Sequence, residues 1–213
     1  GFTGCGTGWI DYDNDGRLDL LVVNGAVKRI PAQDQAGDPF PLRQANQLLH
    51  NAGDGRFEDV TARAGAVFKL QDVSRGLALG DLDNDGDTDA LVTSCNGPAR
   101  LLINEIGQEN DWIGLRLRLR EGGRDAYGAR IAVRLDDGRV LWRRVATDGS
   151  YASASDPRVL VGLGSAEATE VEVHWPGGVV ERFDLSGRES RAYHALTPGA
   201  GEDTPGAGEE VPR

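Results

Sequence analysis

The segments GTGWIDYDNDGRLDLLVVNG (residues 6–25) and LALGDLDNDGDTDALVTSCNG (residues 77–97) decide the fold, because they are two copies of one repeat. Asp11 in the first copy matches Asp81 in the second. In each copy a short apolar run precedes an aspartate-rich loop. A β-rich run follows the loop, and it is too short for a helix. We therefore interpret each copy as two strands joined by an acidic loop.

A weaker echo follows each copy, as NQLLHN (46–51) and ARLLINE (99–105). After the first echo, GDGR (53–56) is a turn sequence that leads into the segment 57–60, which we expect to be a further strand. Strand, acidic loop, strand, turn, strand, turn and strand make one four-stranded blade of a β-propeller. Residues 28–45 interrupt the first blade with three prolines, so we expect a surface insertion there.

The second half of the chain has a different pattern. WIGLRLRLR (112–120) and RIAVRL (130–135) alternate between apolar and arginine side chains. Such alternation is typical of strands with one buried face. Further strands are expected at 139–147, 158–163, 169–175 and 179–185. The sequence thus predicts an all-β chain, with about two propeller blades in residues 1–109 and a small antiparallel β-sandwich or barrel in residues 110–196. Residues 197–213 repeat PGAGE and are expected to be a disordered acidic tail.

Composition supports this division and excludes several classes of protein. Thirty glycines, nine prolines and 6% aromatic residues indicate many short strands with tight turns. The net charge of −11 is concentrated in the two loops and the tail, and no basic segment suits a nucleic acid. No apolar run approaches the roughly 18 residues that span a bilayer. Since the chain has no methionine, we interpret it as a C-terminal piece of a longer protein.

Each acidic loop has the pattern D-x-D-x-D-G-x-x-D, which suits calcium. Calcium takes six to eight oxygen ligands in a flexible shell, whereas magnesium demands octahedral geometry and retains its waters. The carboxylates at positions 1, 3 and 5, the carbonyl at position 7 and the carboxylate at position 9 are the expected ligands. They are Asp11, Asp13, Asp15, Arg17 and Asp19 in the first loop, and Asp81, Asp83, Asp85, Asp87 and Asp89 in the second.

The loops differ from an EF-hand, whose position 12 is acidic. Here Val22 and Val92 occupy that position, within expected strands, so position 9 closes the site. Metal-free Asx-turns would also use aspartate and asparagine. Two copies with the same ligand spacing and the same glycine favour calcium, with two sites.

These residues resemble two known families. The two repeat segments are similar to FG-GAP (VCBS) repeats, the calcium-binding blades of integrin-α-type propellers. The stretch from Asn110 through GARIAVRL (128–135), GLG (162–164) and VEVHWPGG (171–178) to about Tyr193 resembles the ASPIC/UnbV domain. Together they resemble the C-terminal part of the cartilage acidic protein family. The resemblance implies a secreted or surface protein, a propeller with more blades than two, and the ten loop ligands given above.

Other candidate residues have plainer interpretations. His50, His174 and His194 have no nearby nucleophile or paired acid in the sequence, so surface or packing roles are expected. Four tryptophans are expected to anchor the core or strand edges rather than stack on sugars; they are Trp9, Trp112, Trp142 and Trp175.

An arginine stripe and two cysteines complete the candidates. The stripe would bind an acidic polysaccharide, or face solvent with Glu170 and Glu172 as cross-strand partners, and we favour the second. Its members are Arg116, Arg118, Arg120, Arg130 and Arg134. Cys5 and Cys95 form no disulfide framework, and a single bridge between them stays open.

No catalytic motif is present, so the chain is expected not to be an enzyme. The favoured function is a calcium-binding scaffold or adhesion-type binding module in an extracellular, cell-surface or periplasmic location, with a protein or glycan partner. One alternative is the accessory region of a secreted polysaccharide-processing enzyme. Another is a purely structural repeat without a partner.

Overall fold

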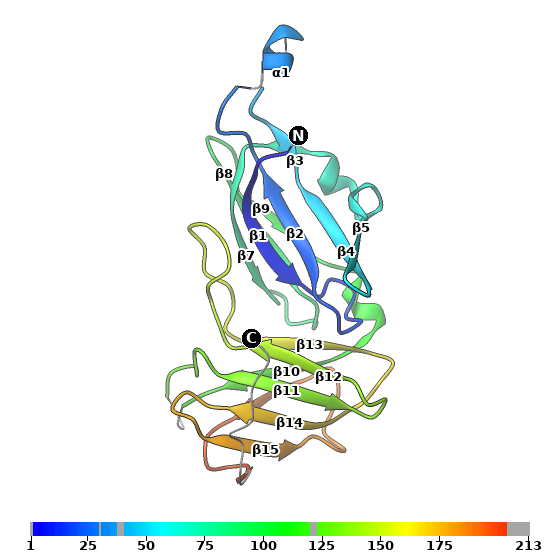
Figure 1. Cartoon of the computed structure of the whole chain (residues 1–213), viewed down its shortest axis with the longest axis vertical. Coiled ribbons are helices and arrows are strands. Elements are labelled where there is room, and N and C mark those ends of the chain that lie inside the picture. Colours follow the sequence, from blue (N-terminus) through cyan, green and yellow to red (C-terminus); the bar gives the residue numbers. More distant parts are fainter. Residues whose placement is uncertain (1, 30, 38–40, 120–122, 204–213) are drawn as a thin grey trace. The chain divides into compact units, whose positions relative to one another are not determined.

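The structure, a computed structural model, describes residues 2–29, 31–37, 41–119 and 123–203. The expected all-β architecture is confirmed, with several sheets that are mostly antiparallel (Figure 1). The chain forms two compact units. Unit 1 contains Gly1–Asp13, Arg17–Gly107 and Asp148–Asp156, and unit 2 contains Asn14–Gly16, Gln108–Thr147 and Pro157–Arg213.

In unit 1 the first repeat forms a four-stranded antiparallel sheet in the order β1-β2-β4-β5, drawn in blue and cyan in Figure 1. Its strands are β1 (Gly4–Ile10), β2 (Asp19–Asn24), β4 (Gln47–Gly53) and β5 (Arg56–Asp59). The acidic loop joins β1 to β2, so strand order and loop position match the blade expected from the sequence. The insertion between β2 and β4 holds helix α1 (Pro31–Gln35) and strand β3 (Gln44–Ala45).

The second repeat forms a three-stranded sheet in the order β7-β8-β9. Its strands are β7 (Ser74–Gly80), β8 (Asp89–Ser94) and β9 (Arg100–Leu102). The shorter elements of unit 1 and of its junction with the next segment are η1 (Thr61–Arg63), η2 (Ala66–Lys69), β6 (Gln71–Asp72) and η3 (Gly107–Glu109). β6 pairs with β3, so the insertion of the first repeat is attached to the segment before the second.

The two sheets of unit 1 share one apolar core. Successive strand residues point to opposite faces, so Leu21 and Val23 of β2 and Val92 of β8 all face inward and are almost completely buried. Gly8 permits the close approach of β1 to β7. A Cβ atom added there would lie 2.8 Å from Leu79 Cδ1.

The open edge of β7 is covered by a segment distant in sequence, Asp148–Asp156. The backbone N–H of Leu77 donates to Ser153 Oγ (3.0 Å), and that of Leu79 donates to Ser155 Oγ (3.1 Å). The N–H of Asp156 returns a bond to Leu79 O (2.8 Å). These bonds satisfy backbone groups that an edge strand otherwise leaves unpaired.

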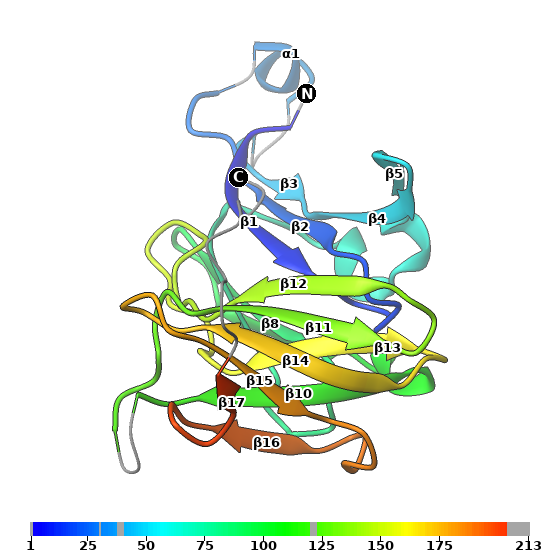
Figure 2. The same cartoon turned by 60° about the horizontal axis from the view of Figure 1, so that its bottom comes forward.

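Unit 2 is a two-sheet sandwich (Figure 2). The strand orders are β13-β10-β16 and β12-β11-β14-β15-β17. The strands are β10 (Asp111–Leu117), β11 (Arg130–Leu135), β12 (Val140–Arg144), β13 (Val159–Gly164), β14 (Ala168–His174), β15 (Val180–Asp184), β16 (Tyr193–Leu196) and β17 (Glu202–Asp203). One pair departs from the expected antiparallel arrangement, because β16 runs parallel to β10.

The alternating pattern accounts for the core of unit 2. Leu115 and Leu117 of β10 are buried, as are Ile131 and Val133 of β11, and all contribute to one cluster. The arginines between such residues face outward. Arg134 Nε lies 3.2 Å from Glu170 Oε1, which agrees with the cross-strand ion pairs expected for the arginine stripe.

A second arginine of the stripe also forms an ion pair, because Arg116 Nε lies 3.0 Å from Asp125 Oδ1. The other expected partner, Glu172, instead pairs at 3.0 Å with Arg182, which is not part of the stripe. Arg120 lies outside the described residues. The stripe is therefore at least partly neutralised by acids of its own unit.

The remaining expectations have mixed outcomes. Trp112 and Trp175 are buried, whereas Trp9 and Trp142 lie on the edge strands β1 and β12 and are 58% and 39% exposed. Cys5 and Cys95 are both free, and the Cys5 thiol donates to Gly25 O at 3.3 Å. Within the tail expected to be disordered, Glu202–Asp203 pairs with β15, and residues 204–213 lie outside the described part.

Candidate metal centre

The two acidic loops turn in the same way. At position 4, Asn14 and Asn84 have φ values of 54° and 63°, and at position 6, Gly16 and Gly86 have φ values of 91° and 93°. Asparagine and glycine are the residues that adopt this left-handed conformation most readily. The two loops therefore have asparagine at position 4 and glycine at position 6 because their backbones follow the same path.

Each loop brings several carboxylates together. Asp11, Asp13 and Asp19 each place an oxygen within 4.8 Å of the others, and so do the three expected ligands Asp81, Asp83 and Asp85. Asp15, Asp13 and His50 also each place a possible ligand atom within 4.8 Å of the others. Ionised carboxylates this close repel one another, so a cation would stabilise the arrangement.

The aspartate at position 9 closes the first loop. Asp19 is fully buried, its Oδ1 accepts a bond from the N–H of Asn51 (2.7 Å), and its Oδ2 accepts one from the N–H of Tyr12 (3.2 Å). Asn51 also donates from Nδ2 to Leu18 O at 3.0 Å. Strand β4 is thereby attached to the C-terminal end of the loop.

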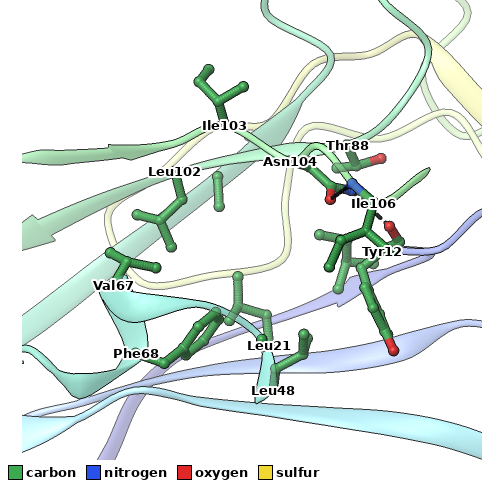
Figure 3. Close-up of a pocket in the computed structure, with 13 residues that line it drawn as sticks. Tyr12, Leu21, Leu48, Val67, Phe68, Thr88, Leu102, Ile103, Asn104 and Ile106 are labelled. Carbon is green, nitrogen blue, oxygen red and sulfur yellow. Dashed lines mark hydrogen bonds between the residues drawn. The ribbon is translucent and has the colours of Figure 1, made fainter. Parts of the chain in front are cut away.

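The second loop repeats this arrangement with equivalent residues. Asp89 accepts bonds from the N–H of Asn104 (2.9 Å) and from the N–H of Leu82 (2.8 Å). Asn104 differs from its counterpart in one respect, because its Nδ2 donates to Tyr12 O (2.7 Å) in the first loop. Asn104 therefore connects the two loops, through its backbone N–H to Asp89 and through its side chain to Tyr12, the second of which is the dashed line in Figure 3.

A cavity of about 80 Å³ lies beside this connection, between the two sheets of unit 1 (Figure 3). Leu48, Phe68 and Leu102 are among its mostly apolar lining residues, with Tyr12 and Asn104 at the end nearest the loops. None of its lining residues is a carboxylate. The cavity thus does not extend the acidic clusters.

Burial and mutual repulsion raise the pKa values of several loop carboxyls. Burial raises the pKa of Asp19 to about 6, and the charge of Asp13 adds to the effect. Burial, together with the charges of Asp85, Asp89, Asp83 and Asp81, raises the pKa of Asp87 to about 8. These carboxyls resist ionisation unless a positive charge is nearby.

Asp87 is the residue of the second loop whose side-chain burial is least favourable. Its side chain is fully buried, and neither carboxylate oxygen accepts a hydrogen bond from the residues that the structure describes. At the same position of the first loop, Arg17 is exposed and its Nε donates to Asn51 O (2.8 Å). The loop pattern predicted only a backbone carbonyl ligand at this position, so the burial of the Asp87 carboxylate was not expected from the sequence.

His50 was expected to have only a surface or packing role, and the structure instead places it beside the first loop. Its Nδ1 lies 3.2 Å from Asp19 Oδ1 and 3.6 Å from Asp13 Oδ2. The absence of a nearby acid in the sequence was misleading, because antiparallel pairing of β2 with β4 brings the residues together.

The echo of each repeat contained a signal for the missed residues. Asn51 and Asn104 occupy the same place in NQLLHN and ARLLINE, and both contact the position 9 aspartate. His50 precedes Asn51, whereas Ile103 precedes Asn104. The alignment of the two copies therefore identifies both the shared residue and the one that differs.

Comparisons with known proteins find a different family model in each half of the chain. Residues 11–92 match the family model of the FG-GAP-like repeat, and residues 120–201 match the model of ASPIC and UnbV. The resemblance inferred from the sequence is thus confirmed for both segments. The chain thus contains one region similar to the FG-GAP-like repeat and one region similar to ASPIC and UnbV, and neither is a catalytic family.

Three curated relatives match most of the chain. Cartilage acidic protein 1 of Homo sapiens is 27% identical over 198 residues, which cover 91% of this chain and 28% of that protein. The Mus musculus protein is 26% identical over 196 residues, covering 91% and 28%. The Xenopus tropicalis protein is 26% identical over 181 residues, covering 80% and 25%.

The chain spans about a quarter of the length of these relatives. None of the helices in the described residues is long and apolar enough to cross a membrane.

Proposed function

We propose that this chain is a calcium-binding, extracellular scaffold or adhesion-type module without catalytic activity. In this proposal each acidic loop holds one calcium ion and fixes the ends of its blade. A protein or glycan partner then binds the stabilised surface. Two kinds of observation support the proposal, the donor set of the loops and the similarity to cartilage acidic protein 1.

The donor set consists of hard oxygen atoms, which calcium prefers. The residues that would hold the first ion are Asp11, Asp13, Asp15 and Asp19, with the backbone carbonyl of Arg17. Those for the second ion are Asp81, Asp83, Asp85 and Asp89, with the backbone carbonyl of Asp87. The bound ion would supply positive charge that neutralises the loop.

The observation that carries the proposal is the burial of Asp87. A fully buried carboxylate whose oxygens accept no hydrogen bond is costly, and four further aspartates add repulsion. A divalent cation in the same loop offsets both costs. Surface Asx-turns would not require the burial of an additional carboxylate, so the metal-free alternative gives no reason for it.

The outward faces of unit 1 support a larger propeller. Trp9 and Phe57 are both exposed on the first sheet, with ring centroids 6.1 Å apart. On the second sheet, the paired residues Leu91 and Leu101 are 39% and 54% exposed. Apolar faces of this kind mark contact surfaces. In a propeller, neighbouring blades cover both faces.

Loops of this kind suit an extracellular location. They lack the bidentate glutamate of an EF-hand at position 12, where Val22 and Val92 lie in strands. Calcium sites of extracellular modules have dissociation constants of roughly 10⁻⁴–10⁻³ M, which match the higher calcium outside cells. The enzyme alternative needs a pair of acids across a cleft, and the cavity of unit 1 supplies none.

The two sites are expected to be separable. Asp13→Ala with Asp15→Ala removes two ligands of the first loop, and Asp83→Ala with Asp85→Ala is the matched change in the second. Titration calorimetry should detect two calcium ions in the unmodified chain and one in either double variant. Because the Asn104 side chain donates to Tyr12 O, the loss of one ion can lower the calcium affinity of the other loop. Loss of both ions in either variant would show that the loops do not bind independently.

The partner can be sought with arrays of glycans and matrix proteins, probed with the chain in calcium and in chelator. The proposal predicts a ligand whose signal is lost in chelator and in the variant with both loops altered. Binding that persists unchanged in chelator would separate partner recognition from the metal loops and contradict this part of the proposal.

A further inference from the structure

We propose that the first loop also binds a transition-metal ion, with zinc as the best fit, through the imidazole of His50 together with the carboxylates of Asp13 and Asp19. The second loop has only oxygen donors and would remain selective for calcium. This inference rests on the proposed function, because it assumes that the first loop is a cation site. It assigns to the two repeats different metal preferences.

The geometry around His50 carries the inference. Its Nδ1 is buried and makes no hydrogen bond to the residues that the structure describes, although carboxylate oxygens lie 3.2 and 3.6 Å away. The side chain as a whole is only 17% exposed. The Tyr12 and His50 rings form a T-shaped pair with their centroids 5.9 Å apart, and this contact holds the imidazole beside the loop.

The donor set is mixed, and this determines the metal. Imidazole nitrogen is a favourable ligand for zinc, whereas calcium and magnesium prefer oxygen. Zinc sites with three protein ligands from histidine and carboxylate residues retain an open position for water. One nitrogen and two carboxylates around the first loop would provide such a set. A small displacement of the side chains would bring the three donor atoms to bonding distance of one zinc ion.

The second repeat provides an internal comparison. Ile103 occupies the position of His50, and it lines the apolar cavity instead of contributing a donor. At position 7 the first loop has the base Arg17 and the second has the acid Asp87. The first loop is thus less negative and richer in nitrogen, and the second is more negative and consists of oxygen donors.

The test isolates the first loop by altering the second with Asp83→Ala and Asp85→Ala. In this background, zinc and calcium affinities are measured by calorimetry before and after His50→Ile, which introduces the residue of the second repeat. His50→Gln keeps a polar side chain without imidazole, and it serves if the isoleucine variant is poorly folded. His194→Ala removes a half-buried histidine of strand β16 as a control for adventitious zinc.

The expected result is a loss of zinc affinity with little change for calcium. Loss of outer-sphere partners alone costs about 10–100-fold in metal affinity, so loss of a ligand should cost at least about tenfold. Calcium affinity should stay within about threefold, because its ligands are oxygens. Zinc should also shift the ¹⁵N resonance of His50 Nδ1, and His194→Ala should change neither affinity.

Three results would overturn the inference. Unchanged zinc affinity in both His50 variants would show that the imidazole is not a ligand. An equal loss of zinc and calcium affinity would show that His50 only positions Asp19. Calcium binding without any zinc binding at the first loop would reject the inference while leaving the calcium proposal intact. Absence of binding by either ion would reject the calcium proposal for this loop as well.

Discussion

Calcium is expected to raise the unfolding temperature of the chain by roughly 5–10 °C for each occupied loop, and magnesium by much less. At a hundredfold excess over the dissociation constant, one bound ion stabilises the folded state by about 2.7 kcal/mol. For a chain of this size, each kcal/mol shifts the melting temperature by about 2–4 °C. Thermal melts in calcium, magnesium and chelator measure the effect.

The control for this experiment removes both sites at once. A variant with Asp13→Ala, Asp15→Ala, Asp83→Ala and Asp85→Ala should melt at the same temperature in all three solutions. The unmodified chain should differ between them, because its clustered carboxylates repel one another when no ion is bound. Equal midpoints for the unmodified chain in calcium, magnesium and chelator would contradict the calcium assignment.

In chelator, the chain is expected to lose stability as the pH rises from about 4 to about 8. Burial raises the pKa of Asp19 to about 6 and that of Asp87 to about 8, whereas in the unfolded chain these carboxyls ionise near the ordinary aspartate pKa of 3.8. The folded state therefore holds protons that the unfolded state has released. Raising the pH therefore favours unfolding. Urea unfolding at several pH values measures it.

Calcium should reverse this dependence, because it binds the ionised carboxylates. The stabilisation by calcium is expected to grow with pH over the same range. Asp87→Asn keeps the shape of the side chain and removes its charge, so it should flatten the loss of stability above pH 6 in chelator. A metal-free chain that is equally stable or more stable at pH 8 than at pH 5 would contradict this account.

Much of the fold follows from local sequence pattern. Strands β1, β2, β7 and β8 lie where the repeat predicts them, because period-two apolar runs and Asn-Gly turns are local signals. The parallel pairing of β16 with β10 was not predictable in this way. Its partners are about 80 residues apart, and the choice of edge depends on the packing of the whole sandwich. The segment Asp148–Asp156 is similar, since it uses serine hydroxyls and has no alternation.

The candidate site shows the same division between local and long-range information. The spacing of the aspartates is local, and the sequence identifies all of them. His50, Asn51 and Asn104 reach the loops only through strand pairing, and comparison of the two repeats is the signal that would have identified them. The burial of the Asp87 side chain depends on packing around the loop, which spacing does not reveal.

A crystal structure of the chain in saturating calcium, with anomalous diffraction data, tests the central claim most directly. The account predicts two anomalous peaks, one in each loop. Each peak should lie about 2.3–2.6 Å from carboxylate oxygens, the distance typical of calcium. One should be bound by Asp11, Asp13 and Asp15, and the other by Asp81, Asp83 and Asp85. Two ordered loops without a peak in either, at saturating calcium, would contradict the claim.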